Sequence, residues 1–317
     1  MCENIKKNIL IINCGIHEKN RQGLTKILHH LQAQNQTHIE KYKFGSIADI
    51  PHYDIIYSPS QAINTALYPN QKFIFGPHFS TFPDVQQLHT FQAHKYKNSI
   101  YIQPSEWVVQ LWKNMDAEQC LPVRPFAFPV DTDKFKPLLA PAERNSVFLY
   151  YKHRDPNELK MVIDFLSQRH INYRLFDYNK RYNEADYLAY LQECKYGIIL
   201  DAHESQGFAI EEALSCDVPL LVWNAQTMNQ EYNSHYQPIP CTSIPYWDNR
   251  CGEFFHRPEE LAVAFQTFQT KLNNSPGQYS PGQYSPRQYS PEQYSPRQYI
   301  LENLSTEKCA AAFNALV

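Results

Sequence analysis

Glycine is scarce in this chain, which has only 9 glycines among 317 residues. An excess of charge of one sign is also lacking, because 29 basic and 32 acidic residues leave a net charge of −3. Without a basic surplus, the chain lacks the electrostatic attraction that draws proteins to nucleic acid or to an anionic membrane. We therefore expect no nucleic-acid partner, while peripheral contact with a membrane stays open.

Long hydrophobic runs and paired cysteine motifs are also missing. No stretch approaches the ~20 apolar residues that cross a bilayer, and the first apolar run, Ile9–Ile12, is too short for a signal peptide. The 8 cysteines include no Cys-x-x-Cys pair. Cys14, Cys194 and Cys216 fall in or beside predicted strands and helices, as buried small apolar residues would. We expect free thiols and a cytoplasmic protein.

What the chain does contain is enough apolar material for one large core or two ordinary ones. Hydrophobic residues make up 43% of the sequence, with 22 tyrosines and 18 phenylalanines. Prolines recur between residues 121 and 142 and indicate a connection between domains. We predict a first domain at 1–138 and a second at 139–273.

Residues 197–223 read as strand, turn, helix and strand. The apolar run Gly197–Leu200 predicts a buried strand, 208–215 a helix and Val218–Val222 the next strand. Parallel sheets built from such units bind ligands at the carboxyl ends of their strands, so a ligand is expected at the turn 203–207. The amino end of the helix favours an anion such as a diphosphate.

Two glutamates frame that turn, Glu204 before the helix and Glu212 within it. Because a carboxylate repels phosphate, we expect both to accept hydrogen bonds from sugar hydroxyls beside the anion. Gly207 lets the backbone approach a ligand closely. This combination suits a nucleotide-sugar. The alternative is that acidic residues simply favour the first turns of a helix.

The segment 204–219, ESQGFAIEEALSCDVP, resembles the Glu-x7-Glu signature of the retaining glycosyltransferases of family four. A second segment, 130–137 (VDTDKFKP), is similar to the stretch that links the two domains of those enzymes. The two segments occur in the expected order along the chain. The resemblance implies an α/β protein of the GT-B fold, with two Rossmann-like domains whose parallel sheets face each other across a cleft.

The resemblance also implies the activity. A sugar would move from a nucleotide-diphosphate donor to a glycan, lipid or protein-linked acceptor, with retention of configuration and with no metal ion or other cofactor. Glu204 would contact donor-sugar hydroxyls beside the anomeric carbon, and Glu212 the ribose hydroxyls. The donor-binding residues assigned with Glu212 are Ser205, Gln206, Gly207, Phe208 and Tyr178.

Two cations follow the predicted strand 146–151. Lys152 and Arg154 are placed where positive charge offsets the charge on a departing nucleoside diphosphate. In the family that the chain resembles, an arginine and a lysine from this region do so. The alternative is a solvated basic turn. Members of that family generally have one more strand–helix unit before the position of residue 197, and it shapes the nucleobase pocket. This chain has little room for such a unit, so the base of the donor stays undetermined.

The amino-terminal half supplies the expected acceptor side. A strand at 8–14, a polar loop at 15–22 and a helix at 23–31 resemble the opening of GT-B acceptor domains, so Gly15 and Gly23 are assigned to the cleft. His78 follows a strand at 72–75, where a histidine can act as acid, base or hydrogen-bond donor. The alternative for His78 is a structural loop residue bonded to backbone.

The motif Ser-Pro-x-Gln-Tyr occurs five times without interruption between residues 275 and 299. A proline every fifth residue forbids a continuous helix, so we interpret 274–299 as a solvated linker. A tyrosine-rich docking tail is the functional alternative. Residues 300–317 are expected to form a terminal helix that crosses back to the first domain, as in GT-B proteins.

Two further functions stay open at this point. One is a GT-B module that binds a sugar nucleotide or regulates a partner without catalysis, favoured by the short first domain, by Gly23 standing without the family's Gly-Gly pair, and by Ser205 and Gln206 in place of its usual Gly-Phe. The other is a different GT-B enzyme, a nucleotide-sugar epimerase or a phosphorylase. A phosphorylase requires a lysine that binds pyridoxal, and no such context stands out.

Overall fold

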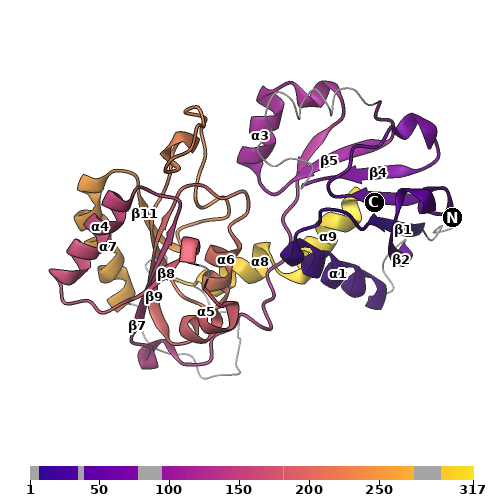
Figure 1. The fold of residues 1–317 in the computed structure, drawn as a ribbon. Helices are drawn as coiled ribbons and strands as arrows, with labels where there is room; N and C mark the ends of the chain where they lie inside the picture. Colours follow the sequence, from indigo (N-terminus) through magenta and orange to yellow (C-terminus); the bar gives the residue numbers. More distant parts are fainter. Residues whose placement is uncertain (1–6, 35–38, 78–94, 181, 275–293) are drawn as a thin grey trace. The chain divides into compact units, whose positions relative to one another are not determined.

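In a computed structural model the chain forms two compact units, which are described separately (Figure 1). The structure describes residues 7–34, 39–77, 95–180, 182–274 and 294–317. The first unit comprises Met1–Pro129 with Leu304–Val317, and the second comprises Val130–Asn303. The division thus falls at Pro129 in the structure, ahead of the boundary placed at residue 138 from sequence.

The first unit is built on a sheet of six parallel strands. The strands are β1 (Lys7–Ile12), β2 (Ile39–Gly45), β3 (Ile55–Ser58), β4 (Lys72–Phe75), β5 (Ser99–Gln103) and β6 (Val123–Pro125). The helices of this unit are α1 (Glu18–Ala33), α3 (Glu106–Asn114) and α9 (Thr306–Leu316), with short 3-10 turns at Ile47–His52, Thr65–Leu67 and Ala117–Gln119. The strand order is β2-β1-β3-β4-β5-β6.

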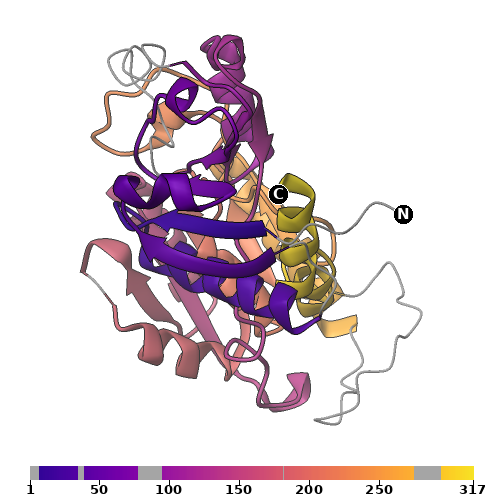
Figure 2. The ribbon, with the colours of Figure 1, turned by 90° about the vertical axis from the view of Figure 1, so that its right-hand side faces the viewer.

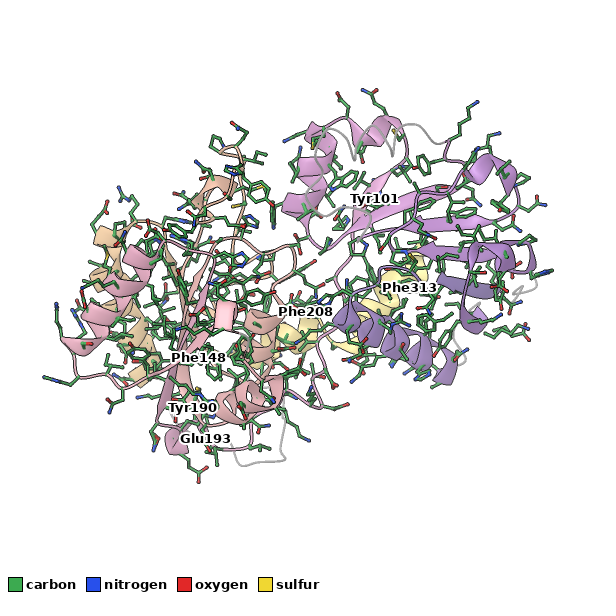
Figure 3. The ribbon with its side chains drawn as sticks, in the orientation of Figure 1. Tyr101, Phe148, Tyr190, Glu193, Phe208 and Phe313 are labelled. Carbon is green, nitrogen blue, oxygen red and sulfur yellow. The ribbon has the colours of Figure 1, made fainter. Side chains whose placement is uncertain are left out.

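Helices cover both faces of this first sheet, which explains why its inner strands are almost continuously apolar. On the α3 side, Trp112 packs against Tyr101 of β5 with ring centroids 4.6 Å apart (Figure 3). On the other side α9 packs against α1 (Figures 1 and 2). Phe313 of α9 meets Phe126 at 5.7 Å. The last helix of the chain is therefore part of the core of the first unit.

The second unit is built on five parallel strands in the order β11-β10-β9-β7-β8. The strands are β7 (Ser146–Lys152), β8 (Arg174–Asp177), β9 (Cys194–Asp201), β10 (Leu220–Trp223) and β11 (Gly252–Phe255). The helices are α4 (Pro156–Ser167), α5 (Glu184–Leu191), α6 (Phe208–Ser215), α7 (Leu261–Asn274) and α8 (Pro296–Asn303), with 3-10 turns at Pro141–Glu143, Tyr178–Lys180, Met228–Gln230 and Pro258–Glu260. Helices α4 and α7 cover one face of this sheet, and α5 and α6 the other (Figure 1).

These two parallel-sheet α/β units confirm the predicted fold class. The strands at 72–75 and 99–103 and the helix at 208–215 begin and end at the predicted residues. Helix α1 differs, because it begins at Glu18 rather than at residue 23 and so converts most of the predicted loop into helix. Strand β2 was not predicted, because its alternation of charged and aromatic residues lies at an exposed sheet edge.

The fifth repeat unit is folded and does not belong to a linker. Helix α8 begins inside it, at Pro296, and Arg297 is only 8% exposed. The Arg297 guanidinium donates to the carbonyl oxygens of Ser215 at 2.7 Å and Phe135 at 3.0 Å. The linker prediction for 274–299 is therefore wrong for this last unit, because its arginine fills a buried site. Residues 275–293 lie outside the described part of the chain.

The described cysteines are free thiols. Cys194 and Cys216 are buried as expected, whereas Cys14 is exposed beyond the end of β1. Within the described residues, none of the helices has the length and hydrophobicity needed to cross a membrane.

Candidate functional site

The candidate site lies in the second unit, at the carboxyl ends of its central strands. Lys152 ends β7 and Asp201 ends β9, and the two residues are register partners in adjacent parallel strands. The turn after β9 carries Glu204 and leads into α6. Parallel sheets place their binding residues at this edge because loops and helix starts converge there.

A buried ion pair forms the centre of the site. The Lys152 ammonium lies 2.5 Å from a carboxylate oxygen of Glu204 and 3.9 Å from one of Asp201. The side chains of Lys152 and Glu204 are 16% and 14% exposed, so water screens the pair only weakly. Burial lowers the pKa of Lys152, but the carboxylates of Asp201 and Glu204 outweigh it and raise this pKa. Lys152 therefore carries a firmly held positive charge.

The two carboxyl groups beside Lys152 respond differently to burial. Burial raises the pKa of Glu204, yet the closer contact with Lys152 outweighs it and the pKa is lowered. For Asp201, whose side chain has no exposed surface, burial prevails over the more distant Lys152 and raises the pKa well above its ordinary value. Burial thus favours the neutral form of Asp201, whereas the contact with Lys152 favours the charged form of Glu204.

An exposed aromatic ring stands beside the lysine. Tyr178, in the turn that follows β8, is 46% exposed and lies with its ring centroid 5.0 Å from the Lys152 ammonium. The His153 ring meets Tyr178 edge-on at 5.5 Å. A ring face at this distance attracts a cation and offers a flat apolar surface to a ligand. Tyr178, predicted from sequence to bind the donor, therefore lies beside Lys152, and its contact with a donor stays a prediction.

The start of α6 is not crowded at Gly207. Gly207 has a left-handed backbone, with φ of 93°, and a side chain built there would meet nothing closer than Glu204 at 3.5 Å. Phe208 opens the helix (Figure 3), and by helix geometry the first N–H groups have no partner within the helix. Ser205 is half-buried in the same turn. These features fit an anion-binding helix start.

Glu212 and Gln206 are more enclosed than the sequence suggested. Glu212, on α6, is 4% exposed, and its charge adds to burial in raising the pKa values of Tyr182 and Tyr187. Gln206 is also 4% exposed, and its amide donates to a carboxylate oxygen of Glu211 at 3.1 Å. Gln206 thus braces the first turn of α6, and Glu212 faces the tyrosines of the α5 region.

Arg154 requires a correction. Its side chain is fully buried and donates two hydrogen bonds to the carboxylate of Glu158, at 2.7 and 2.8 Å. The same guanidinium donates to the carbonyl oxygens of Asp201 and Trp223, each at 3.2 Å. A group so enclosed cannot reach a diphosphate, because it would leave four acceptors behind. Arg154 holds strand ends together, and Lys152 alone of the two predicted cations faces the site.

The residues assigned to the first unit have separate outcomes. Gly15 follows β1 in a left-handed conformation and its carbonyl accepts a hydrogen bond from Ser60 at 2.7 Å, so it lies in a strand-end loop as expected. Gly23 is not in a loop, because it lies within α1 and packs closely against Phe128 and Pro129. Its assignment to a cleft is corrected to helix packing. His78 lies outside the described residues.

A contact between a histidine and an acid lies beside the site and was not predicted from the sequence. His203 precedes Glu204, its side chain is 5% exposed, and its ring nitrogen lies 3.0 Å from the Glu231 carboxylate. Burial lowers the pKa of His203, and the charge of Glu231 opposes this shift without cancelling it. Glu231 comes from the irregular segment after β10, so no spacing in the sequence signals the pair. Asp201 was also missed, although a carboxyl at a strand end is itself a signal.

Among the described residues, no group of three or more histidine, cysteine, aspartate or glutamate side chains is arranged to hold a metal ion. The described site brings together one cation, two carboxyl groups and a helix start. Such a set can hold an anion and accept hydrogen bonds from neighbouring hydroxyls.

No protein-family profile and no curated protein sequence matches the chain. Solved structures do. A glycosyltransferase from Rickettsia africae ESF-5 has a TM-score of 0.60 at 12% identity, covering 97% of each chain. The sucrose-phosphate synthase of Thermosynechococcus elongatus has a TM-score of 0.58 at 10% identity, covering 98% of each chain.

The catalytic domain of starch synthase IV from Arabidopsis thaliana, bound to ADP and acarbose, is also similar. Its TM-score is 0.52 at 11% identity, covering 95% of this chain and 77% of that one. At such identities the likeness establishes the fold and not the activity. The chain has the GT-B fold, and its structural neighbours are glycosyltransferases.

Proposed function

We propose that this protein is a retaining glycosyltransferase that moves a sugar from a nucleoside-diphosphate donor to a glycan, lipid or protein-linked acceptor. The observation that carries the proposal is the pairing of Lys152 with Glu204 beside the uncrowded start of α6. A buried cation and a helix start together suit a diphosphate, and the acid next to them suits sugar hydroxyls.

The donor would lie along the strand ends of the second unit. Its diphosphate accepts hydrogen bonds from the Lys152 ammonium and from the N–H groups of Gly207 and Phe208, with Ser205 alongside. Tyr178, with its exposed ring next to Lys152, contacts the nucleoside or sugar. The ADP held by the starch synthase domain supports a nucleoside diphosphate as the first probe.

The two glutamates bind different hydroxyl groups of the donor. Glu204 accepts from sugar hydroxyls near the anomeric carbon, because it lies within 2.5 Å of the cation that holds the phosphate. Glu212 accepts from the ribose hydroxyls, further along α6. The low exposure of Glu212 means that a hydroxyl reaching it becomes desolvated, which strengthens a charge-assisted hydrogen bond.

In the proposed reaction the acceptor oxygen forms a bond to C1 of the sugar on the face from which the diphosphate leaves. The C1–O bond to phosphate breaks with its electron pair, and the acceptor proton moves to the leaving phosphate oxygen. No side-chain nucleophile, metal ion or other cofactor takes part. Lys152 and the α6 start stabilise the negative charge that builds on the diphosphate.

A pair of alanine variants tests these roles. Glu204→Ala is expected to lower kcat about 100- to 1,000-fold while changing donor affinity less, because it removes a contact to the reacting centre. Glu212→Ala is expected to weaken nucleotide binding about 10- to 100-fold, the value of a lost hydrogen bond to a charged group. Calorimetry measures binding, and release of nucleotide measures transfer.

Glu193→Ala is the matched control, because Glu193 is exposed and lies at the amino end of β9, opposite the site (Figure 3). A product anomer inverted relative to the donor, determined by NMR, would contradict retention. No nucleotide release from UDP-, GDP-, ADP- or CMP-sugars, with or without glycan acceptors, would overturn the transferase proposal in favour of a binding module.

A further inference from the structure

Asp201 is a buried acid that the scheme above does not use. It is the last residue of β9 and has no exposed surface. Among the described residues, no hydrogen bond of ordinary geometry reaches either of its carboxylate oxygens. The Ala202 N–H, which donates to the Lys152 carbonyl, lowers the pKa of Asp201, but burial outweighs this effect. An ionised carboxylate is disfavoured in that position, so the group needs either a cation or a proton.

The charged and titratable groups around Asp201 come from both neighbouring segments. They are Lys152, Tyr150 and Arg154 from β7 and the turn after it, and His203 and Glu204 from the turn after β9. Arg154 does not serve the carboxyl group, since its guanidinium donates to the Asp201 backbone carbonyl. The Ser243 hydroxyl also donates to that carbonyl, at 2.9 Å.

The remaining cation serves the other acid. Lys152 lies 2.5 Å from Glu204 but 3.9 Å from Asp201, beyond hydrogen-bond reach. One ammonium therefore faces two carboxyl groups, and it bonds the closer one. Two buried carboxylates in contact cannot both stay ionised beside a single cation, and the one without a donor takes the proton. The raised pKa of Asp201 and the lowered pKa of Glu204 agree with this assignment.

We propose that Asp201 is a positioning residue, a neutral acid whose O–H donates a hydrogen bond to the Glu204 carboxylate and fixes it beside the α6 start. The side chains of Asp201 and Glu204 are in contact, so this hydrogen bond can form directly between them. This inference rests on the proposed function for its effect on turnover, but the protonation of Asp201 does not depend on any substrate.

The consequence concerns what happens when a donor arrives. A diphosphate draws the Lys152 ammonium away from Glu204, which then loses part of its electrostatic support. The O–H of Asp201 still holds the Glu204 carboxylate in place, so Glu204 keeps its orientation toward the sugar hydroxyls. Without that hydrogen bond, Glu204 would follow the ammonium or turn aside, and the reacting centre would lose a fixed acceptor.

Infrared spectroscopy of the free protein tests the proton directly. At pH 7 the wild type is expected to show the C=O stretching band of a protonated carboxyl group that Asp201→Asn lacks. The band must shift in deuterated water, as that of an exchangeable acid does. A wild-type minus Asp201→Asn difference spectrum at pH 7 with only ionised-carboxylate bands would overturn the proposal, whatever the protein transfers.

Stability against pH gives a second test that needs no substrate. Because the pKa of Asp201 is raised on folding, the folded state keeps a proton that the unfolded chain has released. The free energy of unfolding therefore falls as pH rises from the ordinary aspartate pKa through the folded one. Asp201→Asn cannot titrate and is expected to lose this part of the slope in urea unfolding measured between pH 4 and pH 9. An unchanged slope would contradict the assignment.

Kinetics separate positioning from mere structure. Asp201→Asn keeps an N–H donor toward Glu204 and is expected to retain kcat within a few-fold, with a flatter loss of activity at high pH. Asp201→Ala removes the donor and is expected to lower kcat about 100-fold with little change in KM. If Asp201→Ala does not fold, Asp201→Asn alone decides, since a large loss of kcat in that variant would overturn the role.

The two proposals fail in different ways. If no donor is turned over by the wild type, the transferase proposal fails while the infrared band and the pH slope still test Asp201. If transfer is found but Asp201→Asn and Asp201→Ala both match the wild type in kcat and pH profile, the positioning role fails and the transferase proposal stands.

Discussion

Two left-handed glycines show how differently the two units use the ends of their strands. Gly76 follows β4 in the first unit with φ of 92°, and Gly207 follows β9 in the second with φ of 93°. A side chain at Gly76 would meet the backbone oxygen of Ile102 at 2.4 Å. At Gly207 the nearest atom is at 3.5 Å. The first glycine is required by packing, whereas a methyl group at the second would make only ordinary contacts.

The distribution of buried charge shows the same contrast. Among the described residues of the first unit, the buried polar side chains are neutral ones, such as Ser58 and Gln103. The second unit buries ionisable groups, including Arg154, Asp201 and Glu212. Burying such groups costs free energy unless they are paired, so a unit that gathers them at strand ends does so for more than packing. The contrast supports the proposed site in the second unit.

Removing Arg154 is expected to have the largest effect on stability. Arg154→Ala removes the donor to the Glu158 carboxylate and to the Trp223 carbonyl, while the Asp201 carbonyl keeps the Ser243 hydroxyl. The second unit should lose about 3 to 5 kcal/mol in urea unfolding. Lys160→Ala is the control, because Lys160 pairs with Asp164 on the same helix while 71% and 52% exposed. That control should change stability by less than about 0.5 kcal/mol.

The opposite result for Arg154 would contradict its assignment to a structural role rather than to ligand binding. A variant as stable as the wild type, but with weakened diphosphate binding, would restore Arg154 to the site. It would also show that the guanidinium leaves its buried partners when a ligand arrives.

The glycine pair gives the next largest effect. Gly76→Ala forces a methyl group onto backbone, so the first unit should lose about 3 kcal/mol or more. Gly207→Ala has room for its methyl group and should cost only about 1 to 2 kcal/mol, the strain of a left-handed alanine. Circular dichroism during urea unfolding measures both losses.

Binding should respond to the two glycines in the reverse order. Gly207→Ala is expected to weaken nucleoside-diphosphate binding, because relief of its strain rotates the N–H groups at the α6 start. Equal losses of stability for the two variants would contradict the claim that packing requires glycine at Gly76 but not at Gly207. Unchanged nucleotide binding in Gly207→Ala would contradict a role of the α6 start in binding.

Much of the fold could be predicted because apolar runs bounded by turns specify buried parallel strands. Lys152 and Glu204 were predicted to share a site on this basis, and the structure brings them into contact. The prediction that Arg154 faces the site was wrong for a local reason. His153, between the two cations, has a left-handed φ of 53°, and this reversal of the chain sends Arg154 inward while Lys152 faces the site. Sequence spacing carries no sign of it.

The linker prediction for the repeat was wrong in its last unit for a different reason. The five units of the repeat share serine, proline, glutamine and tyrosine, and the third position is glycine, glycine, arginine, glutamate and arginine in turn. In the fifth unit that third position is Arg297, which makes the tertiary hydrogen bonds that order α8. Because the third and fifth units are identical in sequence, the repeat itself does not predict the hydrogen bonds of Arg297. The carbonyl groups that accept them, those of Thr132, Phe135 and Ser215, are distant in sequence.

Calorimetric titration of UDP, GDP and ADP into the wild type and into Lys152→Met tests the central claim most directly. The account predicts that at least one nucleoside diphosphate binds the wild type, and that its affinity falls about 10- to 100-fold in a Lys152→Met variant that unfolds cooperatively. Absence of binding to the folded wild type by all three nucleotides, or equal affinity for both proteins, would contradict it.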